Sequence, residues 1–102
     1  MKQVMVRYRI KPERAAENQE YIARVFRELE REKPAGIRYA SFKLDDGVSF
    51  VHVASIERPD GKNPLRDLPA FQAFIAEIEA RCDEAPKTVD LHEIGSYGFF
   101  AR

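Results

Sequence analysis

The sequence predicts an α+β fold in which two helices cover one face of a four-stranded antiparallel sheet. Two observations support this prediction. Amphipathic segments follow one another in the order β-α-β-β-α-β, and a hairpin is signalled at residues 37–56, where two runs rich in β-branched and aromatic residues flank Asp46-Gly47. With 102 residues the chain is long enough for one hydrophobic core, and we expect a single domain over residues 1–102.

The first strand and the first helix follow from hydrophobic periodicity. Residues 3–10 alternate between polar and apolar side chains, which is typical of a half-buried strand. Pro12 suits the first position of a helix, and apolar residues recur with helical spacing over residues 22–29, so we expect a helix from Pro12 to about Lys33. Residues 34–36, Pro-Ala-Gly, end this helix, and the glycine is able to take the left-handed conformation.

The hairpin determines which residues share a face of the sheet. If Asp46-Gly47 is the two-residue loop of a type I′ turn, Phe42 lies opposite Val51 and Ser41 lies opposite His52. Partners share a face, and the faces alternate along each strand. We expect the helices to cover the apolar set Ala40, Phe42, Val51 and Val53. The open face then carries the mixed set Tyr39, Ser41, Lys43, Phe50 and His52.

The second half of the chain predicts a loop, a helix and a last strand. Residues 57–68 contain several turn signals and form a long loop, which would either shape a site or an interface or be an ordinary surface connection. Asp67 is the expected N-cap of a second helix, whose apolar stripe runs from Phe71 to Cys82. The last strand is expected to start near Lys87 and to run over residues 88–100.

These elements form a ferredoxin-like arrangement, with the first strand between the third and the fourth. The open sheet face is expected to carry Met5, Tyr39 and Phe50 beside charged side chains, and His92 joins it if Val89 points towards the helices. Such a face is too apolar to remain in water. We therefore expect a homodimer in which two copies pack through the open sheet face and enclose a partly polar cavity.

Composition narrows the range of partners and locations. Seventeen basic and seventeen acidic residues cancel, so we expect neither a nucleic-acid nor a membrane partner. The sequence has no apolar run of about 18 residues, and its N-terminal segment alternates in polarity, unlike a secretion signal. With Cys82 as the single cysteine, these features predict a cytoplasmic protein.

His52 is the first candidate for chemistry, because an imidazole serves as a base or hydrogen-bond donor near neutral pH. The alternative is an interface histidine that is satisfied by a serine or a backbone group. Arg7 would hold a carboxylate or phenolate, or else pair with Asp90 or Glu93. The other residues expected to bind the substrate are Tyr39, Ser41, Phe50 and His92. The alternatives are interface packing for Tyr39 and a polar position on an edge strand for His92. Two isolated histidines without a third ligand predict no metal site.

Three stretches carry a family resemblance: VRYRIKPERAAENQEYIARVF, PAGIRYASFKLDDGVSFVHVASI and LRDLPAFQAFIAEI. Over residues 1–96 the chain resembles the dimeric α+β barrel superfamily, and most of all its antibiotic biosynthesis monooxygenase-like domains. The resemblance implies a homodimer of two facing sheets, with a ligand pocket inside the barrel or between sheet and helices. It carries no shared catalytic set, because relatives range from cofactor-free oxygenases to haem-binding proteins, lactone isomerases and stress-response proteins.

Together these points favour a monooxygenase-like enzyme that acts on an aromatic or conjugated small molecule with molecular oxygen and no bound cofactor. His52 would take or share a proton, while Arg7 and Tyr39 would position the substrate. The alternative is a non-catalytic, small-molecule-binding or stress-associated dimer. It is motivated by the lack of tryptophan, which some oxygenating relatives use. A third possibility is haem binding by His52 or His92.

Overall fold

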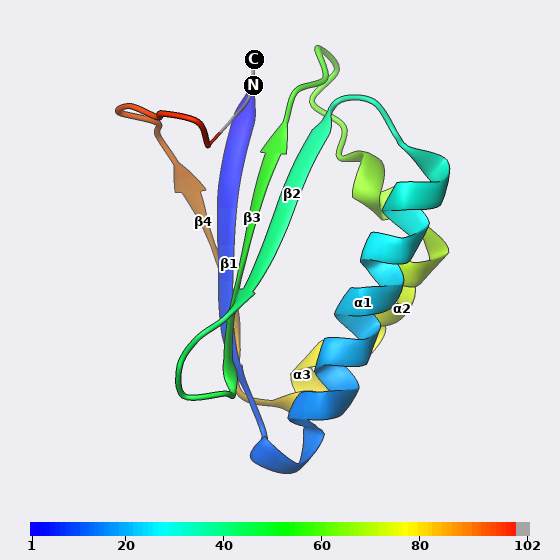
Figure 1. The fold of residues 1–102 in the computed structure, drawn as a ribbon, viewed down its shortest axis with the longest axis vertical. Helices are drawn as coiled ribbons and strands as arrows, with labels where there is room; N and C mark the ends of the chain where they lie inside the picture. Colours follow the sequence, from blue (N-terminus) through cyan, green and yellow to red (C-terminus); the bar gives the residue numbers. More distant parts are fainter. Residues whose placement is uncertain (100–102) are drawn as a thin grey trace.

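The computed structural model describes residues 1–99 and has two layers, a sheet and a helical layer on one side of it (Figure 1). The strands are β1 (Lys2–Ile10), β2 (Ile37–Lys43), β3 (Ser49–Ile56) and β4 (Cys82–Leu91), and the helices are α1 (Ala15–Glu32), α2 (Pro69–Ala76) and α3 (Ile78–Arg81). Two 3₁₀ turns, η1 (Pro12–Arg14) and η2 (Pro64–Asp67), precede α1 and α2. All pairings are antiparallel in the order β2-β3-β1-β4, which confirms the predicted class and strand order.

The first helix ends at Glu32, within one residue of the predicted Lys33, but the capping residue differs from the prediction. Lys33 adopts a left-handed conformation with φ of 46°, and its N–H donates to the carbonyl of Leu29. Gly36 is also left-handed, with φ of 84°, and serves the turn into β2 instead of the cap. A Cβ at Gly36 would collide with the side chain of Arg58, so this position needs glycine for space as well as for φ.

The predicted hairpin register is confirmed, whereas the predicted turn type is wrong. Ser41 pairs with His52, and Phe42 pairs with Val51. Gly47 has φ of 77°, but Asp46 is not among the residues with positive φ, as a type I′ turn would require. The Asp46 carboxylate instead accepts hydrogen bonds from Ser49 Oγ and from two backbone N–H groups. These bonds lower the pKa of Asp46 to about 2.

The predicted facing of the hairpin is reversed. Phe50 pairs with Tyr8 of β1, so the two rings share the face that the alternation of β1 places under the helices. His52 is accordingly 4% exposed, whereas Phe42 is 47% exposed on the open face. The helical layer stands away from the sheet, and large aromatic side chains fill that distance better than the small ones predicted there. Val89 pairs with Met5 and also lies on the open face, so the condition under which His92 was expected to join that face is not met.

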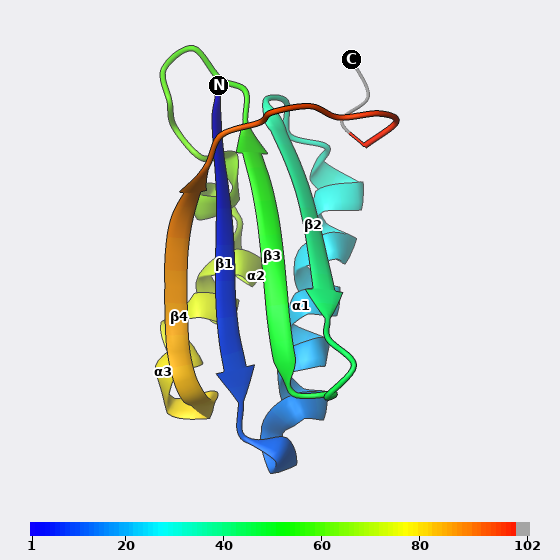
Figure 2. The ribbon, with the colours of Figure 1, turned by 90° about the vertical axis from the view of Figure 1, so that its left-hand side faces the viewer.

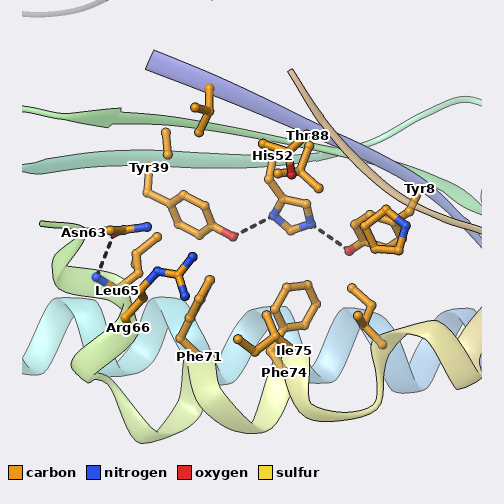
Figure 3. Close-up of a pocket in the computed structure, with 15 residues that line it drawn as sticks. Tyr8, Tyr39, His52, Asn63, Leu65, Arg66, Phe71, Phe74, Ile75 and Thr88 are labelled. Carbon is orange, nitrogen blue, oxygen red and sulfur yellow. Dashed lines mark hydrogen bonds between the residues drawn. The ribbon is translucent and has the colours of Figure 1, made fainter. Parts of the chain in front are cut away.

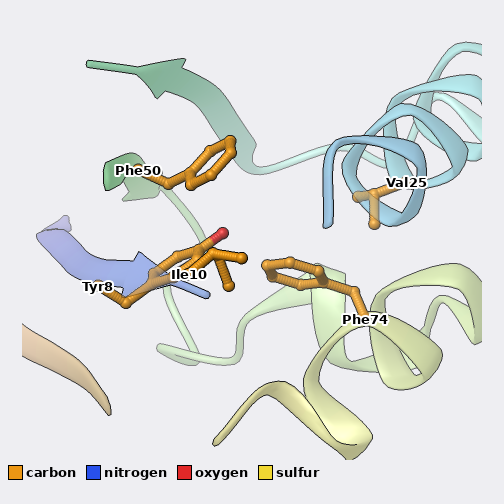
Figure 4. Close-up of a cluster of buried hydrophobic side chains, with 5 residues drawn as sticks. All are labelled: Tyr8, Ile10, Val25, Phe50 and Phe74. Atoms are coloured by element: carbon orange, nitrogen blue, oxygen red, sulfur yellow. The ribbon is translucent and has the colours of Figure 1, made fainter. Parts of the chain in front are cut away.

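The hydrophobic core lies between the sheet and the helices (Figure 4). Tyr8 stacks on Phe50 with ring centroids 5.6 Å apart, and Phe74 of α2 meets Tyr8 from the other layer at 6.4 Å. Val25 of α1 and Ile10 complete the buried cluster. Figure 2 shows the opposite sheet face, which no helix covers.

The second helical region is broken into two short helices. The cap of α2 is Leu68, with Pro69 at the first position, so Asp67 is not the N-cap. Glu77 separates α2 from α3, and β4 begins at Cys82, five residues before the predicted Lys87. β4 ends at Leu91, although the last strand was expected to continue to residue 100. Residue 100 lies outside the described residues.

No helix within residues 1–99 combines the length and the apolar character needed to cross a bilayer.

Candidate functional site

A cavity of about 260 Å³ lies between the sheet and the segment from η2 to α3 (Figure 3). The sheet contributes Val4, Val6, Tyr8, Tyr39, His52, Ala54, Pro86 and Thr88. The other wall is formed by Asn63, Leu65, Arg66, Phe71, Phe74, Ile75 and Ile78. An engineered apolar cavity of about 150 Å³ is known to hold benzene, so this one has room for a ligand of one or two rings.

Aromatic side chains surround His52 inside this cavity. Its ring stacks on Tyr8 and on Tyr39, with centroids 5.3 and 5.8 Å away, and Phe74 approaches at 5.4 Å. Phe71 meets Tyr39 edge-on at 6.5 Å. A flat, apolar ligand would therefore meet ring faces and edges on both sides of the cavity.

Both ring nitrogens of His52 are hydrogen-bonded. Nε2 lies 2.7 Å from Tyr8 Oη. Nδ1 lies 2.8 Å from Tyr39 Oη and 2.6 Å from Ser41 Oγ. Because Nδ1 can satisfy only one strong in-plane bond, the two hydroxyls compete for it. Ser41 alone is enough to satisfy Nδ1, which leaves the Tyr39 hydroxyl able to turn towards a ligand.

A buried arginine gives this set of hydrogen bonds its direction. Arg81 is 1% exposed, and its Nε donates to Asn18 Oδ1 at 3.4 Å. The same guanidinium donates to the Phe74 carbonyl at 2.6 Å and lies over the Tyr21 ring at 4.5 Å. Since a guanidinium only donates, Asn18 must present its oxygen to it and its Nδ2 to the other side.

The direction continues through Tyr8 to His52. Asn18 Nδ2 donates to Tyr8 Oη at 3.0 Å. Tyr8 has then accepted a bond and directs its own hydrogen to His52 Nε2. The neutral imidazole therefore carries its hydrogen on Nδ1, from which it donates to Ser41 or Tyr39. Every donor in this chain points away from the cation and towards the cavity.

Burial keeps His52, Tyr39 and Tyr8, the titratable members of this hydrogen-bond chain beyond Arg81, in their neutral forms. Desolvation lowers the pKa of His52 to about 4. Desolvation also raises the pKa of Tyr39 to about 12, against a smaller opposing effect of a hydrogen bond with Ser41. The pKa of Tyr8 is raised further above its ordinary value, again by burial and in spite of the bond from Asn18. At neutral pH Tyr8, His52 and Tyr39 thus form an uncharged set of hydrogen-bonding groups.

Three of the predicted site residues meet in this cavity region, namely His52, Tyr39 and Ser41. Phe50 does not line the cavity; it is 1% exposed behind Tyr8 in the core. Arg7 lies in a separate hollow on the open sheet face. His92 follows the end of β4, in another hollow beside Gln3 and Glu93. The predicted substrate contacts of Phe50, Arg7 and His92 are therefore not part of this site.

Several site residues were not predicted. Tyr8 was assigned to the core by its alternation, and Asn18 could have been recognised as a polar residue on the buried stripe of α1, seven positions before Val25. Arg66 and Arg81 carried no local signal, because their roles arise from the way η2 and α3 fold back on the sheet. Within the described residues, no three His, Cys, Asp or Glu side chains gather as a metal site would require.

Comparison with known proteins supports the fold. No protein-family model matches the sequence, and no curated protein is significantly similar to it in sequence. A solved structure named antibiotic biosynthesis monooxygenase superposes with a TM-score of 0.75 at 17% identity, over 93% of this chain and 100% of the other. A protein from Bacteroides thetaiotaomicron, proposed in its name to be an antibiotic biosynthesis monooxygenase, gives 0.78 at 14% identity, over 99% and 95%.

A third solved structure is a variant of SnoaB, a cofactor-independent oxygenase from Streptomyces nogalater. It superposes with a TM-score of 0.68 at 16% identity and covers 95% of this chain and 96% of its own. The chain has the antibiotic biosynthesis monooxygenase-like fold. This finding confirms the fold expected from the resemblance. At these identities the likeness concerns the fold alone.

Proposed function

We propose that this protein is a small-molecule oxygenase of the antibiotic biosynthesis monooxygenase-like type. It binds an aromatic or conjugated substrate in the cavity between the sheet and α2 and oxidises it with molecular oxygen, without a bound metal or flavin. The observation that carries the proposal is the directed hydrogen-bond chain that ends at Tyr39 and His52 on the wall of an aromatic cavity. The names of two similar structures, a monooxygenase and a cofactor-independent oxygenase, support it.

In this mechanism the protein stabilises negative charge on a substrate oxygen. A phenolic or enolisable substrate loses a proton to solvent water before it reacts with oxygen, and the negative charge develops on its oxygen atom. The Tyr39 hydroxyl, held by the ring of His52, donates a hydrogen bond to that oxygen from a site of low dielectric, where such a bond is strong. For an anthrone, the methylene carbon gains one atom of oxygen as a carbonyl, and its two hydrogens leave with the other oxygen atom as water.

His52 holds the donor in place and shares its proton. Its Nδ1–H donates to one of the two hydroxyls, and its Nε2 accepts from Tyr8. The role predicted from the sequence, in which His52 takes or shares a proton, is thus proposed here in its sharing form. The low pKa of His52 favours a shared hydrogen bond over full transfer of the substrate proton to the imidazole.

The same geometry supports a second candidate, a protein that binds an aromatic molecule without turning it over. Both nitrogens of His52 are bonded to protein groups, and a histidine whose pKa is about 4 is a weak base. In that case ligands raise the melting temperature, since they bind the native state, but no product forms.

Aerobic turnover of a panel of hydroquinones and anthrones tests the oxygenase. We expect the wild type to exceed the rate without protein, and His52→Ala and Tyr39→Phe to lose about 100-fold, the usual worth of a positioned proton donor. Tyr97→Phe, at a tyrosine that is 102% exposed, is the matched control and should keep the wild-type rate. Equal rates with and without the wild-type protein would remove the oxygenase, and ligand-induced thermal stabilisation would then favour the binding protein.

We also propose that the protein is a homodimer packed through the open sheet face. Phe42 and Val89 are 47% and 46% exposed there, on a face that carries Met5, Arg7 and Val53 as well. Burying this apolar surface against a second copy removes it from water. The cavity described above lies on the other side of the sheet, so this contact would leave the cavity intact. A cytoplasmic location stays a prediction from composition.

A further inference from the structure

The cavity opens beside a second, basic hollow. This hollow has a volume of about 440 Å³ and shares Val4, Asn63, Arg66 and Thr88 with the cavity. It adds Lys2 and Lys62, so three cations face a single carboxylate, that of Asp67. We call this basic hollow the mouth of the cavity. The protein as a whole has no net charge, so the local excess of positive charge belongs to the mouth itself.

Arg66 links the two spaces. It lines both, and Figure 3 shows its side chain extending from η2 towards the sheet, beside Tyr39. Eight ion pairs occur within the described residues, and neither Arg66 nor the two lysines of the mouth takes part in them. Most other arginines in the same residues do have a carboxylate partner, as Arg58 has Asp60.

A neutral donor stands next to this cation. Asn63 Oδ1 accepts from the backbone N–H of Leu65 at 3.0 Å, which fixes the amide. Its Nδ2 makes no hydrogen bond to another group within residues 1–99, and Figure 3 shows it pointing away from the Leu65 bond. The mouth thus presents a guanidinium fork and an amide N–H that the protein itself does not satisfy.

We propose that the natural ligand is an aryl carboxylate, whose apolar ring occupies the cavity and whose carboxylate is bound at the mouth by Arg66 and Asn63. This inference rests on the proposed function, because it names the ligand class of the same cavity. A planar guanidinium matches a carboxylate with two parallel bonds. Lys2 and Lys62 add long-range attraction for the anion. The role that the sequence assigned to Arg7 is thereby transferred to an arginine on the helical side of the sheet.

Calorimetric titration with matched acids and amides tests this assignment. The ligands are 2-naphthoate, benzoate and cinnamate, each compared with its neutral primary amide. We expect at least one acid to bind the wild type about tenfold tighter than its amide, the effect of one good charged contact. Arg66→Gln should bring the acid close to the amide and leave the amide unchanged, while Arg66→Lys should retain part of the preference because it keeps the charge but not the fork.

Arg24→Gln is the matched control, since Arg24 is an exposed arginine on α1 and lies outside both hollows. It should preserve the preference for the acid, and the preference should weaken in about 0.5 M salt because exposed charges are screened. Equal affinity for acids and amides in the wild type, or an unchanged ratio in Arg66→Gln, would overturn the carboxylate assignment and leave a binding cavity. Absence of binding by every ligand would overturn both the assignment and the cavity as a ligand site.

Discussion

The buried, neutral state of His52 predicts that folding stability depends on pH in a defined window. The folded-state pKa is about 4, whereas an unfolded histidine titrates near 6.5. Between these values the unfolded chain binds a proton that the native chain does not, so the free energy of unfolding falls as the pH drops from about 6.5 towards 4. From pH 7 to pH 5 this linkage amounts to about 2 kcal/mol, a large share of a small domain's stability.

The test is urea unfolding at pH 7, 6 and 5, followed by far-UV circular dichroism at one protein concentration. Carboxylates with lowered pKa values, such as Asp46, lose their contribution only below about pH 4.5, so they leave this window nearly undisturbed. The variant is His52→Gln, which keeps a hydrogen-bonding side chain but cannot titrate. Its free energy of unfolding should change far less than that of the wild type over the same pH range.

His92→Gln serves as the control for loss of an imidazole, because His92 is exposed at the end of β4. It should retain the wild-type slope. If the wild type and His52→Gln instead lose stability in parallel between pH 7 and 5, the argument that burial holds His52 neutral is wrong.

Three further outcomes follow from the structure. Tyr8→Phe removes the donor to His52 Nε2 and leaves buried partners unsatisfied, so the free energy of unfolding measured in urea should fall by about 1–3 kcal/mol. An unchanged free energy would refute the hydrogen-bond chain through Tyr8. Gly47→Ala should cost about 1–2 kcal/mol from its positive φ, and Gly36→Ala should cost more, because its Cβ also meets a side chain; equal thermal shifts would contradict this ranking. Phe42→Lys on the open face should weaken the dimer at least tenfold in light scattering across dilutions, and a monomeric wild type would refute the dimer itself.

Local pattern was a sound guide to the elements and to the pairing of the hairpin. A strand alternates with a period of two, and the partners of Ser41 and Phe42 follow from symmetric counting outward from the turn. That counting needs only the centre of the turn, so it succeeded although the turn type was wrong. Asp46 does not take the positive φ that was expected. Its carboxylate instead stabilises the turn by accepting three hydrogen bonds.

The choice of face could not be made from the hairpin alone. Its two faces both contain apolar residues, with Phe42 and Val51 on one and Tyr39 and Phe50 on the other. Alternation has no preference between them. The pairing of Phe50 with Tyr8 decides the matter, because β1 has only one apolar face to offer the helices, and that face brings His52 with it.

The sequence by itself determined the order of the elements, because that order follows from local periodicity. It also determined the strand order, because β-α-β-β-α-β chains prefer the ferredoxin-like arrangement. The choice of His52 as a candidate residue came from residue chemistry and stays a prediction. Only the tertiary structure decided where the site is. Asn18, Arg81 and Arg66 come from three separate elements. Arg66 lines the cavity, and Arg81 and Asn18 are connected to His52 through Tyr8, because α1, α3 and η2 pack on the same face of the sheet. Contacts of that kind depend on packing between distant segments, which no local pattern records.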